Sequence, residues 1–569
     1  MPLPGNSWTR TRAALGCGLL VVASSLSSAA QAPAPPPTSI ASPSFGETLD
    51  VRVVNLEAVV VDKSGNRVNG LTPADFLLRV DGKEVPIEYF TEVSGGQAVE
   101  RTATAGGAPV TSGMPSLQPG TPVGTSYLVF VDDFFPVAAD RNRTLDKLRS
   151  ELARLSPEDR MAVVAYDGRK LDMLTTWSQS VPALERVLEK AKDRPAYGLR
   201  RITELRSADR DRQLRDQSFG NVASTLGAGT VTTQLELSDR SFAEDLAAQV
   251  SGAVDAAVAT LRSFAAPPGR KVMLLLSGSW PYDPPQYVIN DLTKLVSEPS
   301  IPSGDKLIRP LSDTANLLGY TVYPVDVPGL QGSGLDAEDQ TVDDAATTTL
   351  NARNREQDGE TTMLYIARQT GGKALLNGLR DKAFETVVGD TRSYYWLGFT
   401  PQRKGDDHRY SVKLEVRRPG LKIRSREGFL DFSRSSEVSM QVESALLFGN
   451  PPTTHPLRVE LGKPLKASRS TFKLPLTIFI PLDQLTMLTI AGQTMAELEL
   501  RVAALDENGR RSEVSVIPVK IAGHGNPAPG QVSRYETTLE LRKAKQSLVV
   551  ALYDKASGSL LSSTLEVTP

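Results

Sequence analysis

Residues able to carry out catalytic chemistry are few in this chain and lie far apart. Histidine occurs only three times, at His408, His455 and His524. This scatter does not suit zinc, because a zinc site needs clustered histidine or cysteine ligands. No Gly-x-Ser-x-Gly, Walker or Gly-x-Gly-x-x-Gly pattern lies where a strand would meet a helix. We therefore predict no catalytic residues and no enzyme activity, with a hydrolase of unfamiliar site as an alternative.

Two other groups of reactive or aromatic residues have ordinary structural explanations. Asp406 and Asp407 are adjacent in a turn-like segment, which suits solvation better than acid–base catalysis. Tyr394, Tyr395 and Trp396 form an aromatic strand. We expect that strand to pack in a core, and a platform for a ligand is the alternative.

The segment from residue 125 to residue 402 alternates between short apolar runs and amphipathic stretches. Tyr127–Val131 has the continuous apolar character of a buried parallel strand. Such alternation predicts a doubly wound, Rossmann-type α/β domain with helices on both faces of its sheet. We expect its last strand at Tyr394–Phe399. Polar stretches at residues 193–238 and 331–360 are expected to be solvated insertions.

Short β segments flank this predicted domain on both sides. Residues 47–92 alternate at Phe76, Leu78 and Val80, and residues 403–434 alternate from Tyr410 onward. Two or three strands alone rarely make a stable core. The pattern therefore predicts one small β module built from both flanks, with residues 93–124 as a linker.

The C-terminal region, residues 435–569, has period-two patterning and no helical period. This pattern predicts an antiparallel β-sandwich. The chain as a whole is then expected to be a multidomain α/β plus β protein. The clearest alternation in the C-terminal region is at Phe472, Leu474, Leu476, Ile478 and Ile480.

The N-terminus has the features of a secretory signal. Arg10 and Arg12 precede an apolar run, and small residues follow it up to Ala30. This order predicts a signal peptide over residues 1–30 and a Pro-rich linker over residues 31–46. The only cysteine, Cys17, lies inside the apolar run, so the mature chain would hold no thiol. Attachment of a lipid to Cys17 stays as an alternative.

Charge and hydropathy narrow the range of partners. The formal net charge of −2 argues against nucleic acid, which needs a basic face. No later stretch has the long apolar run of a membrane helix, so we expect no transmembrane segment in the mature chain. The expected location is the periplasm, the cell surface or the medium.

Several segments of the chain are similar to a known family. Tyr127–Asp132, with the strand entry at Asp159–Val163, resembles a von Willebrand factor A (VWA) domain. The chain more specifically resembles a family of secreted bacterial VWFA-related proteins. The segments that carry this second resemblance are residues 59–83, Ala367–Ala374, Ser393–Phe399, Arg409-Tyr410 and Arg424–Phe429. The matches extend from about residue 50 to residue 430.

The resemblance implies a divalent-cation site at the carboxyl end of the sheet, built on Asp-x-Ser-x-Ser. Here both serines are replaced, and Gly278 stands where a distant aspartate is implied. A hard cation needs several oxygen ligands, so this loss predicts no cofactor and no bound Mg²⁺ or Ca²⁺. The alternative is that the remaining oxygen donors regroup around a cation. The residues at these degenerate positions are Asp132, Asp133, Ser277 and Ser279.

The resemblance favours a non-enzymatic, adhesion-type protein that binds extracytoplasmic protein partners. Ligands of open α/β folds bind at the carboxyl end of the sheet. Aromatic anchors on the loops there suit a protein interface, and we expect them to be exposed. A cation-dependent adhesin and a structural envelope component are the alternatives. The predicted binding residues are Phe134, Phe135, Pro136, Trp280 and Tyr282.

Overall fold

A computed structural model gives the fold of the chain, which is a mixed α/β protein with several antiparallel sheets. The predicted signal peptide and Pro-rich linker lie outside the described residues. The structure describes residues 54–99, 120–219, 232–233, 236–264, 269–278, 280–289, 295–296, 298–327, 342–377, 382–401, 404–448, 455–490, 493–507, 512, 514–523 and 527–569.

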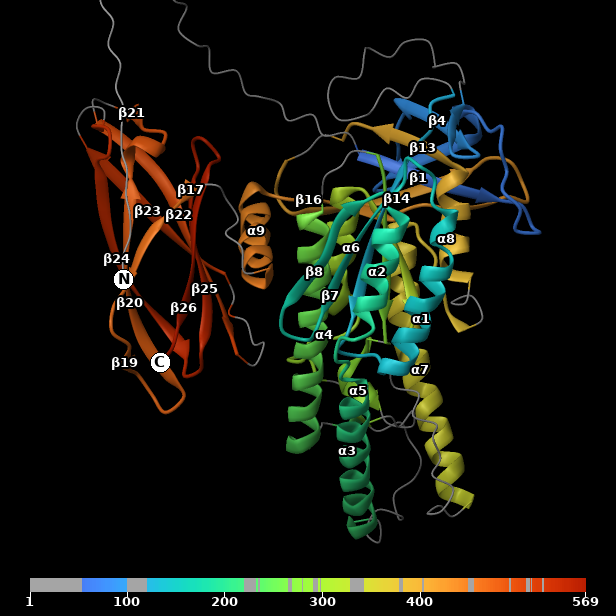
Figure 1. Ribbon diagram of the computed structural model, residues 1–569, viewed down its shortest axis with the longest axis horizontal. Coiled ribbons are helices and arrows are strands. Elements are labelled where there is room, and N and C mark those ends of the chain that lie inside the picture. Colours follow the sequence, from blue (N-terminus) through green and yellow to red (C-terminus); the bar gives the residue numbers. More distant parts are fainter. Residues whose placement is uncertain are drawn as a thin grey trace, which may run out of the picture. The chain divides into compact units, whose positions relative to one another are not determined.

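A five-stranded sheet forms the centre of the α/β part (Figure 1). Its strands lie in the order β12-β10-β6-β7-β8. The first four are parallel, and only the edge strand β8 is antiparallel to its neighbour. The parallel strands are buried on both faces, which explains their continuous apolar runs. The bounds are β6 Thr125–Asp132, β7 Arg160–Tyr166, β8 Leu171–Ser178, β10 Arg270–Ser277 and β12 Tyr320–Asp326.

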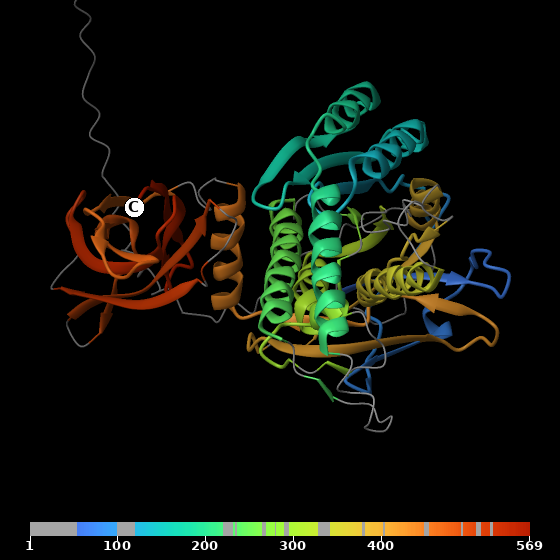
Figure 2. The same cartoon turned by 90° about the horizontal axis from the view of Figure 1, so that it is seen from below.

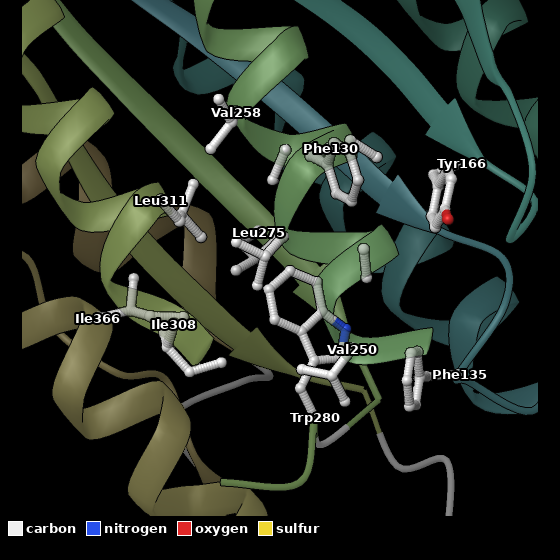
Figure 3. Close-up of a cluster of buried hydrophobic side chains, with 14 of the residues drawn as sticks. Phe130, Phe135, Tyr166, Val250, Val258, Leu275, Trp280, Ile308, Leu311 and Ile366 are labelled. Atoms are coloured by element: carbon white, nitrogen blue, oxygen red, sulfur yellow. The ribbon is translucent and has the colours of Figure 1, made fainter. Parts of the chain in front are cut away.

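Helices cover both faces of this sheet. Alternate residues of β6 enter two separate apolar clusters, with Leu128 and Phe130 on one face and Val129 and Val131 on the other. Figure 3 shows the first cluster, in which Phe130 and Leu275 of the sheet lie near Leu311. The first face packs against α4 Leu237–Ser263, α5 Pro284–Ile289, α6 Asp305–Leu318 and α7 Val342–Thr370; the second packs against α1 Ala138–Ser150, η2 Leu152–Arg154, α2 Val181–Ala191 and α8 Ala383–Arg392.

The strand order reverses at β6, because the chain continues to β7 on one side of β6 and later to β10 on the other. Such a switch point brings two strand ends together with a crevice between them. Asp132 ends β6 and Ser277 ends β10. The topology therefore places these two residues side by side at the carboxyl edge of the sheet.

The two polar stretches expected to be solvated insertions contain long helices, and the first of these helices has one buried face. Residues 198–219 form α3, Gly198–Phe219, and residues 342–360 belong to α7. Arg201 and Leu205 of α3 are buried, because their spacing of four puts them on one helix face turned to the protein. Nearby, the short strands β9 Thr232–Thr233 and β11 Leu295–Val296 pair in parallel.

The two flanks of the α/β part join in a single β module, in two sheets that share one apolar core. β2 pairs with β14, and Leu78 lies opposite Leu414. Figures 1 and 2 show the early blue strands beside the late orange ones. The sheets are β15-β1-β13-β4-β5 and β16-β14-β2-β3. Their bounds are β1 Val54–Val61, β2 Phe76–Val80, β3 Lys83–Glu84, β4 Tyr89–Ser94, β5 Gln97–Val99, β13 Tyr394–Phe399, β14 His408–Val416, β15 Lys422–Arg424 and β16 Gly428–Asp431; η1 Pro73–Asp75 precedes β2.

Two details of the β module differ from the prediction. Tyr394–Phe399 forms a strand as expected, but it lies between β1 and β4 rather than in the central sheet. Its residues Tyr395 and Leu397 pack in the core of the β module, which supplies the apolar partner for this face. The expected linker 93–124 begins with β4 and β5 and ends at β6, and residues 100–119 lie outside the description.

The C-terminal region contains two β-sheets that pack through one apolar core. The expected period two is confirmed in β20, where alternate side chains from Phe472 to Ile480 are buried. A helix was not expected, yet α9 Arg434–Phe448 precedes the strands and packs on Val549 and Ala551. The strands are β17 His455–Pro456, β18 Arg458–Leu461, β19 Leu465–Lys466, β20 Thr471–Pro481, β21 Leu488–Ile490, β22 Gln493–Asp506, β23 Ser515–Gly523, β24 Val532–Arg542, β25 Gln546–Asp554 and β26 Leu560–Val567, with η4 Leu482–Gln484.

Within the described ranges, none of the helices combines the length and the apolar character that crossing a bilayer requires.

Candidate functional site

The carboxyl edge of the central sheet is organised around the buried carboxylate of Asp132. One oxygen, Oδ1, accepts the backbone N–H groups of Phe134 and Phe135 at 2.8 and 3.2 Å. The other, Oδ2, accepts the Ser277 hydroxyl at 3.0 Å and the Trp280 indole N–H at 2.8 Å. Four protein donors therefore surround the carboxylate that the VWA resemblance assigns to a cation.

The electrostatics of this carboxylate reflect its burial. Burial raises the pKa of Asp132 to about 6, although the four hydrogen bonds act in the opposite direction. The Arg201 guanidinium of α3 lies over the rings of Phe134 and Phe135, at 4.6 and 4.2 Å from their centres. Burial lowers the pKa of Arg201 to about 10, and the charge of Asp132 partly offsets that effect. Arg201 is therefore a fixed positive charge near Asp132.

Asp133 is held by two arginines. Its Oδ1 lies 2.6 Å from Nη1 of Arg141, and its Oδ2 lies 2.6 Å from Nε of Arg194. Burial raises the pKa of Asp133, while both arginines favour its charged form. Because both oxygens of Asp133 are paired with arginines, this carboxylate is poorly placed to coordinate a metal ion. Ser279, the fourth degenerate position, lies outside the described residues.

Four of the five predicted binding residues lie around Asp132 at this edge, whereas Tyr282 lies against Tyr365 of α7, and most of the five are not exposed. Phe135, Pro136 and Trp280 are buried, whereas Phe134 and Tyr282 are half-buried. Figure 3 shows Trp280 and Phe135 inside the apolar cluster. The expectation of an exposed aromatic surface is therefore wrong for three of the five.

Helix α3 covers the part of this edge that follows β6. Its first turn is bonded to the loop after β6, because Tyr197 N–H donates to the Asp133 carbonyl at 2.9 Å and Gly198 N–H to that of Pro136 at 3.1 Å. A Cβ at residue 198 would overlap the Pro136 carbonyl group, so only glycine fits there. Helix α3 thus covers the loop after β6, which the sequence predicts to be exposed.

The residue that sequence reasoning missed is Arg201. It lies in the polar stretch 193–238, which the sequence predicts to be solvated. A signal was present, since Arg201, Leu205 and Arg212 recur at helical spacing.

The cavity beside Arg201, bounded by Gln249 and Tyr287, has a volume of about 30 Å³. This is room for about one water molecule.

No group of three or more metal-binding side chains gathers anywhere in the described part of the chain. The three histidines do not form a cluster in the sequence, and His524 is outside the description. His408 is exposed, and its Nε2 lies 3.7 Å from Asp81. At the sheet edge, hydrogen-bond donors surround the carboxylate of Asp132. The described residues there do not pair an acid with a general base.

Comparisons with known proteins give no family for this chain. No protein-family model matches it, and no curated protein is similar in sequence. Among solved structures, the TFIIH p34 N-terminal domain is 13% identical, covering 48% of this chain and 97% of that one, with a TM-score of 0.21. A Bacteroides uniformis β-glucuronidase is 10% identical over 31% of this chain and 19% of that one, with a TM-score of 0.15. TM-scores this low do not establish a shared fold.

Proposed function

We propose that this chain is an exported, non-enzymatic protein of the cell envelope that binds other proteins through a VWA-like domain without a metal ion. The network around Asp132 is the observation that carries this proposal. Protein donors occupy both of its oxygens, and Arg201 supplies a positive charge nearby. A side-chain network of this kind can hold the sheet edge in place, which is the structural part of the work a cation would do.

The order of the central strands supports the VWA-like assignment. Asp132 lies at the switch point of the sheet, where open α/β folds bind their ligands. Export is supported by the charged, apolar and small-residue order of residues 1–30.

Metal independence is tested by thermal unfolding with calcium, magnesium or manganese at millimolar concentration. We expect an almost unchanged melting temperature, because a ligand stabilises a protein only by binding its folded state. A rise of several degrees that disappears in Asp132→Ala and in the milder Ser277→Ala would contradict metal independence and favour a cation-dependent adhesin.

Protein binding and export are tested in the intact organism. We expect crosslinking in intact cells to capture a protein partner of the envelope. A purely structural component would instead crosslink only to copies of itself. N-terminal sequencing should find a chain that begins just after Ala30, and an intact Met1 in a cytosolic fraction would contradict export.

A further inference from the structure

A cleft lies beside the C-terminal end of α7. Its volume is about 460 Å³, within the ~300–1,000 Å³ of typical ligand sites. Its walls come from α7, from residues 372–374, from β14 and from residues 423–427. Two of these walls belong to the segments 367–374 and 424–429 that carry the family resemblance.

The cleft forms where two neighbouring strands diverge. β16 pairs with β14 up to Ser411, and Val412 N–H then donates to the Glu427 carbonyl at 2.8 Å. Before Glu427 the chain does not follow β14, because residues 422–424 pair with β1 instead. The space between β14 and β15 is therefore a wedge that no backbone pairing closes.

The charge of the cleft is strongly positive, although the whole chain carries −2. The two carboxylates that pair with Arg424 and Lys413 of the cleft are each shared with a second cation. Asp390 pairs with both Arg67 and Arg424, and Glu415 pairs with both Arg79 and Lys413. A single acid, Glu427, lines the cleft together with five cations, Arg368, Lys373, Lys413, Arg424 and Arg426.

Lys373 is the cation with the least compensation. It has no ion pair or hydrogen bond to any residue that the structure describes. Burial lowers its pKa, and the charges of Arg424 and Arg67 lower it further. Arg368, on the rim, has only an exposed contact with Glu427 at 3.4 Å, which neutralises little of its charge.

The cleft is also partly apolar. Leu364 of α7 is 53% exposed at its rim, and Ile423 on the opposite wall is half-buried. The cations lie on separate walls of the cleft, beside these apolar side chains. Separated carboxylates that alternate with apolar side chains match such walls better than one compact phosphate group does.

We propose that this cleft binds an extended acidic peptide segment of a partner protein, with carboxylates at Lys373 and Arg368 and an apolar side chain against Leu364. The inference rests on the proposed protein-binding function and names its surface and the chemistry of its partner.

The test measures fluorescence anisotropy of a labelled peptide of alternating glutamate and leucine added to the full chain. We expect binding that weakens with salt. The double variant Lys373→Gln/Arg368→Gln should lose at least about tenfold in affinity. The matched control, Lys466→Gln/Arg469→Gln, removes two exposed cations from the C-terminal region and should bind as the unaltered protein does.

Circular dichroism checks that the variants are folded. Leu364→Glu, at an exposed position, is a second variant that should repel the peptide without disturbing the core. The inference would be overturned if both cleft variants bound the peptide as tightly as the unaltered protein, or if a glutamine–leucine peptide also bound. It would likewise be overturned if the protein bound only inorganic phosphate or phosphatidylglycerol vesicles. Crosslinking of a partner in cells that survives both cleft variants would overturn it too, while leaving the proposed protein-binding function intact.

Discussion

At the scale of single residues, burial and four hydrogen bonds set the pKa of the Asp132 carboxylate. The folded-state pKa of about 6 lies above the ordinary 3.8. The folded chain therefore binds more protons than the unfolded chain between these two values. It follows that the contribution of Asp132 to the free energy of unfolding falls as pH rises from about 4 to about 6.

Replacing Trp280 with phenylalanine tests this view of Asp132. The change removes the indole donor from Oδ2, and we expect a cost of about 1–3 kcal/mol. The folded-state pKa of Asp132 should rise further, because a hydrogen bond to its charged form is lost. Urea denaturation should therefore show a larger loss of stability at pH 7 than at pH 5.

Trp396→Phe is the matched control for this experiment. Trp396 is similarly buried, but its indole N–H has no hydrogen-bond partner in the described structure. Its replacement should destabilise the protein equally at both pH values. Equal losses at pH 5 and pH 7 for Trp280→Phe as well would show that Asp132 does not depend on the indole.

At the scale of elements, the end of α7 shows how closely helix and sheet are fitted. The helix ends at Thr370, whose hydroxyl accepts the Val322 N–H of β12 at 3.1 Å. Gly371 follows with a φ of 77°, a conformation in which glycine commonly ends a helix. A Cβ on Gly372 would overlap the Val322 carbonyl oxygen. The chain thus passes against β12 with no room for a side chain.

Gly372→Ala should consequently be strongly destabilising, since neither backbone can move without breaking the contact of α7 with β12. Thermal unfolding measures the effect. Gly389→Ala is the control, because Gly389 is exposed within α8 and nothing lies near its added Cβ. That control should gain up to about 1 kcal/mol from improved helix propensity. A Gly372→Ala protein as stable as the control would refute the close approach.

At the scale of the whole molecule, the β module ties together segments that are far apart in sequence. Leu78 and Leu414 face each other in the pairing of β2 with β14. Asp75, just before β2, binds Arg418 at 2.7 Å. This contact is the largest cause of a pKa of about 2 at Asp75. Each flank therefore depends on the other for its hydrogen bonds and its core.

Leu78→Ala should cost about 2–5 kcal/mol and should speed amide hydrogen exchange in residues 410–416 of the other flank. Leu500→Ala removes an equally buried leucine from the C-terminal core. It should leave exchange in residues 410–416 unchanged, because Leu500 belongs to a different apolar cluster. Unchanged exchange in Leu78→Ala would mean that the two flanks are independent.

The sequence by itself determined the features that depend on local pattern. The expected strands formed at two such patterns, the apolar run at Tyr127–Val131 and the alternation from Phe472 to Ile480. Periodicity reports the local geometry of the chain and which face is apolar, so these predictions needed no knowledge of distant residues.

The tertiary structure alone decided which partner each apolar face found. Tyr394–Phe399 had the pattern of a strand, but only pairing with β1 and β4 put it in the β module. Phe135 and Trp280 had the character of loop anchors, and helix α3 buried one beneath Arg201 while Asp132 fixed the other through its indole. Burial arises from contacts between segments that are distant in sequence, and a local pattern of residues does not specify those contacts.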